Sequence, residues 1–265
     1  MDTKYWGPSG WKLLHLIAAG DSTPAFWNTL PYVLPCKFCR TSLSSYYIEH
    51  PFPSSSKEST VQKWLWIIHN KVNTKLRGQG LKVAPNPPFE TVNTYYSNLI
   101  NQPCSKTVFP GWEFLFSIAD NHPNHSPSVP MPNYSKDEKT NDDSKLTDLE
   151  YKNKWNILSP TERKQQLKKF WEALPDSLPY KEWQTSWKTH AGPISKAVKS
   201  RSSALRWLWK IKCGLEKDLN QLGNENFYGL CKQVARKRSG CATSKKAKTC
   251  RANTTRKQKS RKSVS

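Results

Sequence analysis

The sequence Pro35-Cys36-Lys37-Phe38-Cys39 places two cysteines three positions apart, directly after a proline, at the predicted start of a helix that runs on through Tyr47. Two such cysteines can close a small disulfide. The positive end of the helix dipole stabilises a thiolate at this position, which makes the pair easy to reduce and re-oxidise. The pattern therefore favours a redox-active pair made of Cys36 and Cys39.

Half of a zinc site is the alternative interpretation of a C-x-x-C pair. A structural zinc site needs four ligands, which usually come from a second C-x-x-C or from an H-x₃₋₅-H. The chain contains neither pattern. We therefore predict no metal site.

Charge and composition limit the class of protein. The net charge is +22, and the stretch from Lys232 to Ser265 holds 13 Lys or Arg residues and no acid. Such a tail is expected to be disordered and to bind polyanions in a salt-dependent way, or to serve as an address. The apolar stretch Leu13–Ala19 is far too short to cross a bilayer, so we expect no membrane contact.

Apolar spacing and breaker residues predict helices over 6–20, from the cysteine pair to near His50, over 59–77 with Ser59 or Thr60 as its cap, over 89–100 and over 111–119. The fold class is therefore all-α. In the helix at 59–77, His69, Asn70 and Asn73 share one edge. Asparagine is a poor helix former, so this edge is either a solvated face or a binding site.

Three motifs in order resemble the Erv/ALR family of FAD-linked sulfhydryl oxidases. The family's G-x-x-x-W-x-x-x-H, C-x-x-C and H-N-x-V-N patterns, with a leucine after the last, match Gly7, Trp11 and His15, then Cys36 and Cys39, then His69, Asn70, Val72, Asn73 and Leu76. The match covers roughly residues 1–120.

The resemblance implies a reaction and a division of roles. It implies oxidation of a dithiol by O₂ with release of H₂O₂ and with FAD as the electron relay. It makes Cys36 the sulfur that exchanges with the substrate and Cys39 the sulfur beside the flavin. It assigns Gly7, Trp11, His15 and the H-N-x-V-N residues to the cofactor. The partners expected are thiol-containing proteins and O₂.

Two departures from the family pattern bear on these expectations. Pro8 stands where the family usually has Arg, which puts a phosphate contact in doubt. Only Cys104 stands where the family usually carries a structural disulfide, so that disulfide is expected to be missing. Short forms of this kind resemble those of large DNA viruses. Because the first residues have no signal-peptide layout, we expect synthesis in the cytosol. The resemblance to the viral forms implies action in the host cytoplasm or virion.

The second half of the chain repeats the first in degenerate form. FWNTLPYVLPCKF at 26–38 is echoed by FWEALPDSLPYKE at 170–182, WKLL at 11–14 by WNIL at 155–158, and WLW-x-I at 64–68 by WLW-x-I at 207–211. The cysteine and H-N-x-V-N positions are not kept in the second copy. The expected organisation is an oxidase domain at 1–120, a linker at 121–148, a degenerate pseudo-oxidase bundle at 149–235 and a basic tail at 236–265.

The repeat leads to further expectations. The second bundle could take the place of the partner that the family's dimers use, although homodimers of the fused chain stay open. We expect its core to contain Trp155, Phe170, Trp171, Leu174, Leu178, Trp207 and Trp209. A mobile shuttle pair is expected from the resemblance, either Cys241 with Cys250 or Cys213 with Cys231. The competing function is a non-enzymatic, nucleic-acid-binding helical protein with a structural C-x-x-C.

Overall fold

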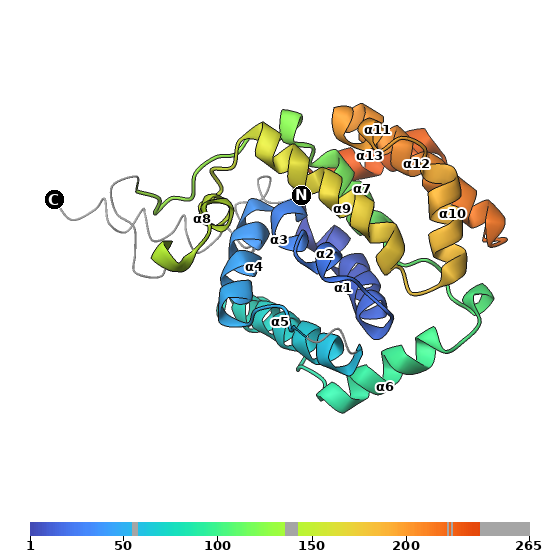
Figure 1. The fold of residues 1–265 in the computed structure, drawn as a ribbon, viewed down its shortest axis with the longest axis horizontal. Helices are drawn as coiled ribbons and strands as arrows, with labels where there is room; N and C mark the ends of the chain where they lie inside the picture. Colours follow the sequence, from blue (N-terminus) through green and yellow to red (C-terminus); the bar gives the residue numbers. More distant parts are fainter. Residues whose placement is uncertain (55–57, 136–142, 222, 224, 239–265) are drawn as a thin grey trace.

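The computed structural model describes residues 1–54, 58–135, 143–221, 223 and 225–238. Every regular element assigned in these ranges is a helix, and none is a strand (Figure 1). This confirms the all-α class. The α-helices are α1 (Thr3–Ala19), α2 (Pro24–Trp27), α3 (Leu30–Val33), α4 (Lys37–Glu49), α5 (Glu58–Gly78), α6 (Phe89–Ile100), α7 (Trp112–Asp120), α8 (Asp148–Lys154), α9 (Pro160–Ser177), α10 (Lys181–Ala191), α11 (Ser195–Lys199), α12 (Arg201–Asp218) and α13 (Phe227–Lys237). Short 3₁₀ turns occupy Cys104–Lys106, Pro123–His125 and Asp143–Lys145.

The helix boundaries follow the predictions closely, with two corrections. Helix α1 begins three residues early, because the Asp2 side chain accepts a hydrogen bond from the backbone N–H of Lys4 at 3.0 Å and caps the first turn. Pro8 lies inside the helix, in its second turn. Helix α5 begins at Glu58, so the residues expected to cap it, Ser59 and Thr60, lie in its first turn.

Helix α1 forms the centre of the first half. It packs against α5, α6 and α7. Small residues allow the close approach to α7: a Cβ atom at Gly111 would lie 2.4 Å from Cδ2 of Leu13, and one at Gly10 would lie 3.1 Å from Cδ2 of Phe114. Any larger residue at Gly111 would force the buried Leu13 side chain or the helices themselves to shift.

The two halves of the chain share one hydrophobic core. Helix α9 packs on α2 and α3, while α7 packs on α12 and α13, and α9 crosses the middle of the molecule in Figure 1. Phe26 of the first half contacts Phe170 of the second, with ring centroids 5.7 Å apart, and both side chains are fully buried. The separation into an oxidase domain and a pseudo-oxidase domain stays a prediction, and the packing joins the two into a continuous core.

Two of the three sequence echoes fall on equivalent elements. Cys36 and Tyr180 are both N-cap residues with extended backbone, ahead of α4 and α10. Trp64 and Trp207 both lie in the long helices α5 and α12. The third echo does not match, because Trp11 lies in the middle of α1 while Trp155 follows the last residue of α8.

The predicted core residues of the second half are largely buried. Phe170, Trp171, Leu174, Leu178 and Trp207 are all in the core, and Trp209 is half-buried against it. Trp155 is not in this core, and the prediction for it was wrong. It is half-buried beside the ring of Tyr134, and its indole N–H donates to Asp143 at 3.3 Å.

The described part of the segment predicted as a linker packs against the helices. Val129 accepts hydrogen bonds through its carbonyl from Asn156 and Lys37, and His122 is fully buried. At the far end, α13 extends to Lys237, so its last two residues fall within the predicted basic tail. The remainder of that tail, from residue 239, lies outside the described residues. Among the described helices, none combines the length and apolarity needed to cross a membrane.

Candidate active site

The cysteine pair lies at the start of α4. Cys36 is the N-cap residue and is buried, and Cys39 lies one turn further on and is half-buried. Both are thiols in this structure. A hydrogen bond to Cys36 and burial raise the pKa of the Cys39 thiol well above its usual value. The two sulfurs are therefore close enough to interact directly.

Two cations that sequence reasoning missed act on this pair. Lys75 of α5 and Arg40 of α4 both favour the Cys39 thiolate and so oppose the rise of its pKa. The Arg40 side chain is buried and has no carboxylate partner among the described residues; it donates to the carbonyl of Leu34 at 2.7 Å and to Oδ1 of Asn156 at 2.8 Å. Lys75 donates to the hydroxyl of Ser42 on α4. Both cations are thus held in place beside the sulfurs.

Residues from the second half of the chain make hydrogen bonds to α4, the helix that carries the cysteine pair, and to the segments before it. Asn153 donates to the Pro31 carbonyl at 2.9 Å and to the Ser44 hydroxyl at 2.7 Å, which ties α8 to α3 and α4. Asn156 orients Arg40 and has a positive φ of 54°, which asparagine tolerates better than most residues. No motif or spacing in the sequence predicted these contacts.

A groove of about 500 Å³ opens on Cys36. Its lining residues come from several parts of the chain. The segment around the start of α4 contributes Pro35, Cys36, Lys37, Phe38 and Arg40, and the end of α7 with the segment after it contributes Asp120, Asn121, His125, Ser126, Pro127 and Val129. The other lining residues are Met1, Asn156, Arg201 and Arg238. Cys39 does not line the groove; it interacts instead with Lys75 on α5. The two cysteines therefore face different surroundings, Cys36 towards the groove and Cys39 towards α5.

The predicted cofactor residues of α1 and α5 come together. The rings of Trp11 and His69 are stacked, with centroids 3.8 Å apart and an interplanar angle of 9°. Nε2 of His15 lies 3.0 Å from Nδ1 of His69. The ring of Tyr96 on α6 stacks on His15 at 4.9 Å, and sequence reasoning missed it. The cluster joins three helices through ring contacts.

Burial keeps both imidazoles of this cluster uncharged. It lowers the pKa of His15 to about 3, with the neighbouring His69 adding to the effect, and it lowers the pKa of His69 to about 4. At neutral pH the pair therefore presents hydrogen-bonding groups without positive charge.

An amide group extends the cluster along α5. Asn73 donates to Oδ1 of Asn86 at 2.9 Å, and Arg77 donates to the same oxygen at 2.6 Å. Asn86 and Arg77 were not predicted, because no spacing in the sequence points to them. The other predicted residues of α5, which are Asn70, Val72 and Leu76, are partly exposed. Gly7 lies half-buried in α1, and a Cβ there would meet no atom within 4 Å.

The remaining cysteines lie apart from the pair. Cys104 is a buried thiol. Cys213 on α12 and Cys231 on α13 are half-buried thiols that are not joined to each other. Cys241 and Cys250 lie outside the described residues. In the described ranges no group of three or more His, Cys, Asp or Glu side chains is placed to hold a metal ion.

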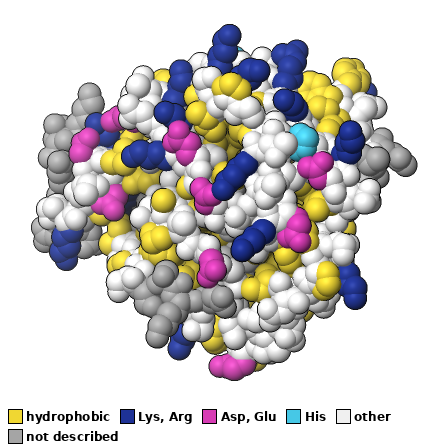
Figure 2. Space-filling model, turned by 45° about the vertical axis from the view of Figure 1, so that its right-hand side comes forward, with side chains coloured by type: hydrophobic (Ala, Val, Ile, Leu, Met, Phe, Trp, Pro, Cys, Tyr) yellow, Lys and Arg dark blue, Asp and Glu magenta, His cyan; other side chains and the backbone are white. Residues whose placement is uncertain are grey.

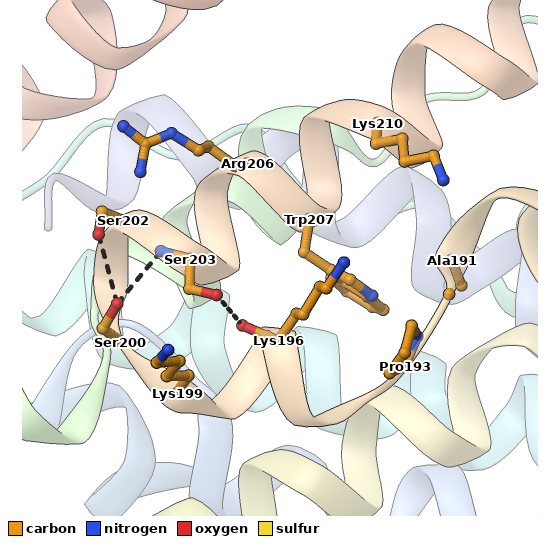
Figure 3. Close-up of a pocket in the computed structure, with 11 residues that line it drawn as sticks. Ala191, Pro193, Lys196, Lys199, Ser200, Ser202, Ser203, Arg206, Trp207 and Lys210 are labelled. Carbon is orange, nitrogen blue, oxygen red and sulfur yellow. Dashed lines mark hydrogen bonds between the residues drawn. The ribbon is translucent and has the colours of Figure 1, made fainter.

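A second cavity, of about 520 Å³, lies in the other half between the end of α10, α11 and α12 (Figure 3). Exposed Lys196, Lys199, Arg206 and Lys210 surround it, and its lining contains no cysteine. On the face drawn in Figure 2, Lys and Arg side chains gather along the upper edge, while acidic ones are scattered below. This cavity has no redox group, which separates it from the groove at Cys36.

The chain is similar to known proteins of one enzyme family. Residues 8–86 match the model of the Erv1 / Alr family. The chain is 30% identical over 123 residues to an FAD-linked sulfhydryl oxidase of African swine fever virus (isolate Tick/Malawi/Lil 20-1/1983), covering 42% of this chain and 98% of that protein. It is 34% identical over 88 residues to the mitochondrial FAD-linked sulfhydryl oxidase ERV1 of Saccharomyces cerevisiae, covering 29% of this chain and 45% of that protein. It is 35% identical over 86 residues to a probable FAD-linked sulfhydryl oxidase of Acanthamoeba polyphaga mimivirus, covering 28% of this chain and 59% of that protein. No solved structure matches the chain.

The chain belongs to the Erv1/Alr family, and it is an FAD-linked sulfhydryl oxidase. The side chains on α1, α5 and α6 fit a flavin. Flat aromatic faces, uncharged imidazoles and amides are the groups that hold a planar heteroaromatic ligand. In addition, Oδ1 of Asn93 on α6 is buried without a hydrogen-bond partner, and no residue of α6 is fully buried although Phe89, Tyr96 and Leu99 are apolar. An unpartnered buried oxygen and an incompletely buried apolar face are expected where a ligand such as the flavin packs against α6.

Proposed function

We propose that this chain oxidises pairs of protein thiols to disulfides through Cys36 and Cys39, with O₂ as the final acceptor and H₂O₂ as the product. The observation that carries the proposal is the position of the pair: Cys36 lines the groove, while Cys39 lies beside α5, which carries the H-N-x-V-N residues. One sulfur can meet a substrate while the other stays on the side of the cofactor residues. The test is oxygen uptake with a dithiol by the yellow, flavin-loaded protein.

The thiol steps follow from disulfide exchange. A substrate thiolate attacks Sγ of Cys36 in the Cys36–Cys39 disulfide, which forms a mixed disulfide and releases Cys39 as a thiolate. The second substrate thiolate then attacks the substrate sulfur of the mixed disulfide, so that the substrate leaves oxidised and Cys36 leaves as a thiolate. Two electrons now reside on the cysteine pair. FAD, when bound, supplies the two-electron relay from this pair to O₂.

The residues around the pair have separate tasks in this proposal. Arg40 and Lys75 stabilise the thiolates that each exchange produces. Trp11 and His15 on α1 would hold the cofactor from one side, and His69 and Asn73 on α5 from the other. We propose one FAD per chain, since the second half carries an ion pair, Lys212 with Glu216 at 2.5 Å, where the first half has His69 and Asn73.

Replacing His69 and Asn73 together by alanine is expected to release FAD and to lower the melting temperature. His69 stacks on Trp11, and a ligand that binds only the folded state stabilises it by mass action. The flavin-to-protein absorbance ratio after gel filtration and a thermal melt measure the two effects. Thr74→Ala, at an exposed position on the same helix, is the matched control. A double variant that stays yellow and keeps its melting temperature would show that this edge is a solvated face.

Lys75→Met is expected to move the acid limb of the pH–rate profile to higher pH. Lys75 lowers the pKa of Cys39, so its loss raises that pKa further, and a higher pH is then needed to form the thiolate. Flavin reduction by dithiothreitol, followed over a range of pH, measures the shift. Lys71→Met, which removes a surface ion pair with Glu49, should leave the profile in place. Identical profiles for Lys75→Met and the unchanged chain would contradict the role given to Lys75.

Several finer points remain proposals. We retain the second half as an internal partner for the oxidase half, with homodimers of the whole chain as the alternative to be decided by solution mass. We also retain a virus-type enzyme acting in the host cytoplasm or virion, supported by the viral relatives. The basic tail as a polyanion contact is a further prediction. The non-enzymatic alternative is set aside, because the chain belongs to a family of flavoenzymes.

A further inference from the structure

The groove at Cys36 is strongly cationic. Four of its lining residues, Lys37, Arg40, Arg201 and Arg238, carry a permanent positive charge. Its one carboxylate among the described lining residues is Asp120, which is buried. The entrance to the redox pair is therefore positive, whatever the charge of the rest of the surface.

The single carboxylate is already neutralised. Nε of Arg238 donates to Oδ2 of Asp120 at 2.7 Å, and Nε of Arg201 lies 3.7 Å from Oδ1. The Arg238 side chain is 40% exposed, so part of its charge faces the solvent at the groove. Lys37, directly after Cys36, is half-buried. These cations can meet a ligand that enters from solution.

The sequence carries further charge of the same sign after Arg238. Nine more Lys or Arg residues and no acid follow Arg238. Charges of one sign around a concave site focus the field, raise the local concentration of oppositely charged ligands and speed their association. A positive field also offsets the rise in thiol pKa that neighbouring carboxylates cause, so it keeps an acidic substrate in its thiolate form.

We infer that the preferred substrates of this enzyme are acidic: dithiol segments whose cysteines are flanked by Asp or Glu. The inference rests on the proposed function, since it takes Cys36 as the sulfur that meets the substrate. The exchange chemistry is unchanged by it. The carboxylates of the substrate would lie against Lys37 and Arg238 while its thiolate attacks Sγ of Cys36.

The test uses the flavin-loaded full chain and three synthetic dithiol peptides with the same cysteine spacing, flanked by glutamates, glutamines or lysines. We expect kcat/KM from oxygen uptake to fall in that order. The glutamate and glutamine peptides should differ by about tenfold at low salt, which is the lower end of the rate increase that electrostatic steering gives to association. The difference should shrink in about 1 M NaCl, where the Debye length is about 3 Å. Equal kcat/KM for the three peptides would overturn the inference.

Matched charge reversals separate the groove from the net charge of the molecule. Lys37→Glu should abolish most of the preference for the glutamate peptide. Lys210→Glu, which changes the net charge equally at the remote cavity of Figure 3, should leave it. The quantity compared is the ratio of kcat/KM between two peptides. A direct effect of position 37 on the reactivity of the cysteines changes both values equally and cancels in this ratio. An equal loss in both variants would assign the preference to the whole surface and overturn the inference. If Lys37→Glu does not fold, Arg238→Gln is used in its place. This change removes a cation from the groove, and buried Asp120 still has Arg201 as an ion-pair partner.

Two further readouts distinguish this inference from the proposed function. Oxidation of uncharged dithiothreitol reports on the redox centre alone, so its absence would overturn the proposed function. Fluorescence anisotropy with the glutamate peptide, its cysteines replaced by serine, reports on the groove without turnover. Binding that is salt-sensitive and weakened by Lys37→Glu but not by Lys210→Glu supports the acidic preference. Binding that is the same for all three flanks counts against it.

Discussion

Cys36→Ser and Cys39→Ser are each expected to reduce dithiol oxidation to the background rate while the protein stays yellow. Both sulfurs are needed, because the exchange requires a disulfide between them and a serine oxygen cannot form one. The flavin should stay bound, since the ring and amide cluster on α1, α5 and α6 is left intact. Oxygen uptake with dithiothreitol and the visible absorbance spectrum measure the two effects.

Cys213→Ser and Cys231→Ser are the controls for this result. Both thiols lie on helices of the second half and outside the groove lining, so oxidation of a small dithiol should be unaffected. Cys231 does lie within electrostatic reach of Asp120 and Arg238, which line the groove. Oxygen uptake that persists in a chain carrying serine at both 36 and 39 would refute the assignment of the redox pair.

Trp171→Ala is expected to cost about 3–5 kcal/mol of the free energy of unfolding. The indole is 1% exposed and meets the rings of Phe170 at 4.9 Å and Trp207 at 5.3 Å, so its loss leaves a large cavity. A loss of this size is a large fraction of the stability of an ordinary domain. Urea unfolding followed by tryptophan and flavin fluorescence together would measure it. Trp209→Ala, at a half-buried position, should cost clearly less.

The same experiment tests how the two halves are coupled. Because the core runs from Phe26 to Phe170 without a break, the two signals should change in one transition. The flavin half should therefore be destabilised by a change made in the other half. Two separate transitions, with the flavin signal unaffected by Trp171→Ala, would favour two independent domains.

The helices of the first half and the main site could be predicted from the sequence, because their signals are local. The 3.6-residue spacing of apolar residues gave α5, α6 and α7 to within a residue or two, and the proline at 51 gave the end of α4. The redox pair and the Trp11–His69 cluster followed from three short motifs. Local signals of this kind do not depend on the partner that a helix later meets.

The parts that could not be predicted depend on contacts between distant residues. Arg40 looks like an ordinary surface cation in the sequence, and only packing with Asn156 and Leu34 buries it beside the cysteines. Asn86 and Tyr96 reach the site from a loop and a helix whose spacing carries no motif. Trp155 was expected in the core because of an echo of four residues, but the chain turns there instead of continuing a helix.

The backbone N–H of Asp2 donates to the carbonyl of Lys237 at 2.8 Å, and Met1 and Arg238 both line the groove. A peptide grafted ahead of Met1, or placed after Arg238 in a chain shortened there, would therefore begin at the groove that Cys36 lines. Its thiols would react within the same molecule, at an effective concentration in the millimolar range for a short flexible connection. Oxidation of such a graft would become first order and independent of enzyme dilution, so even a poorly recognised cysteine pair could be joined by tethering it to either end.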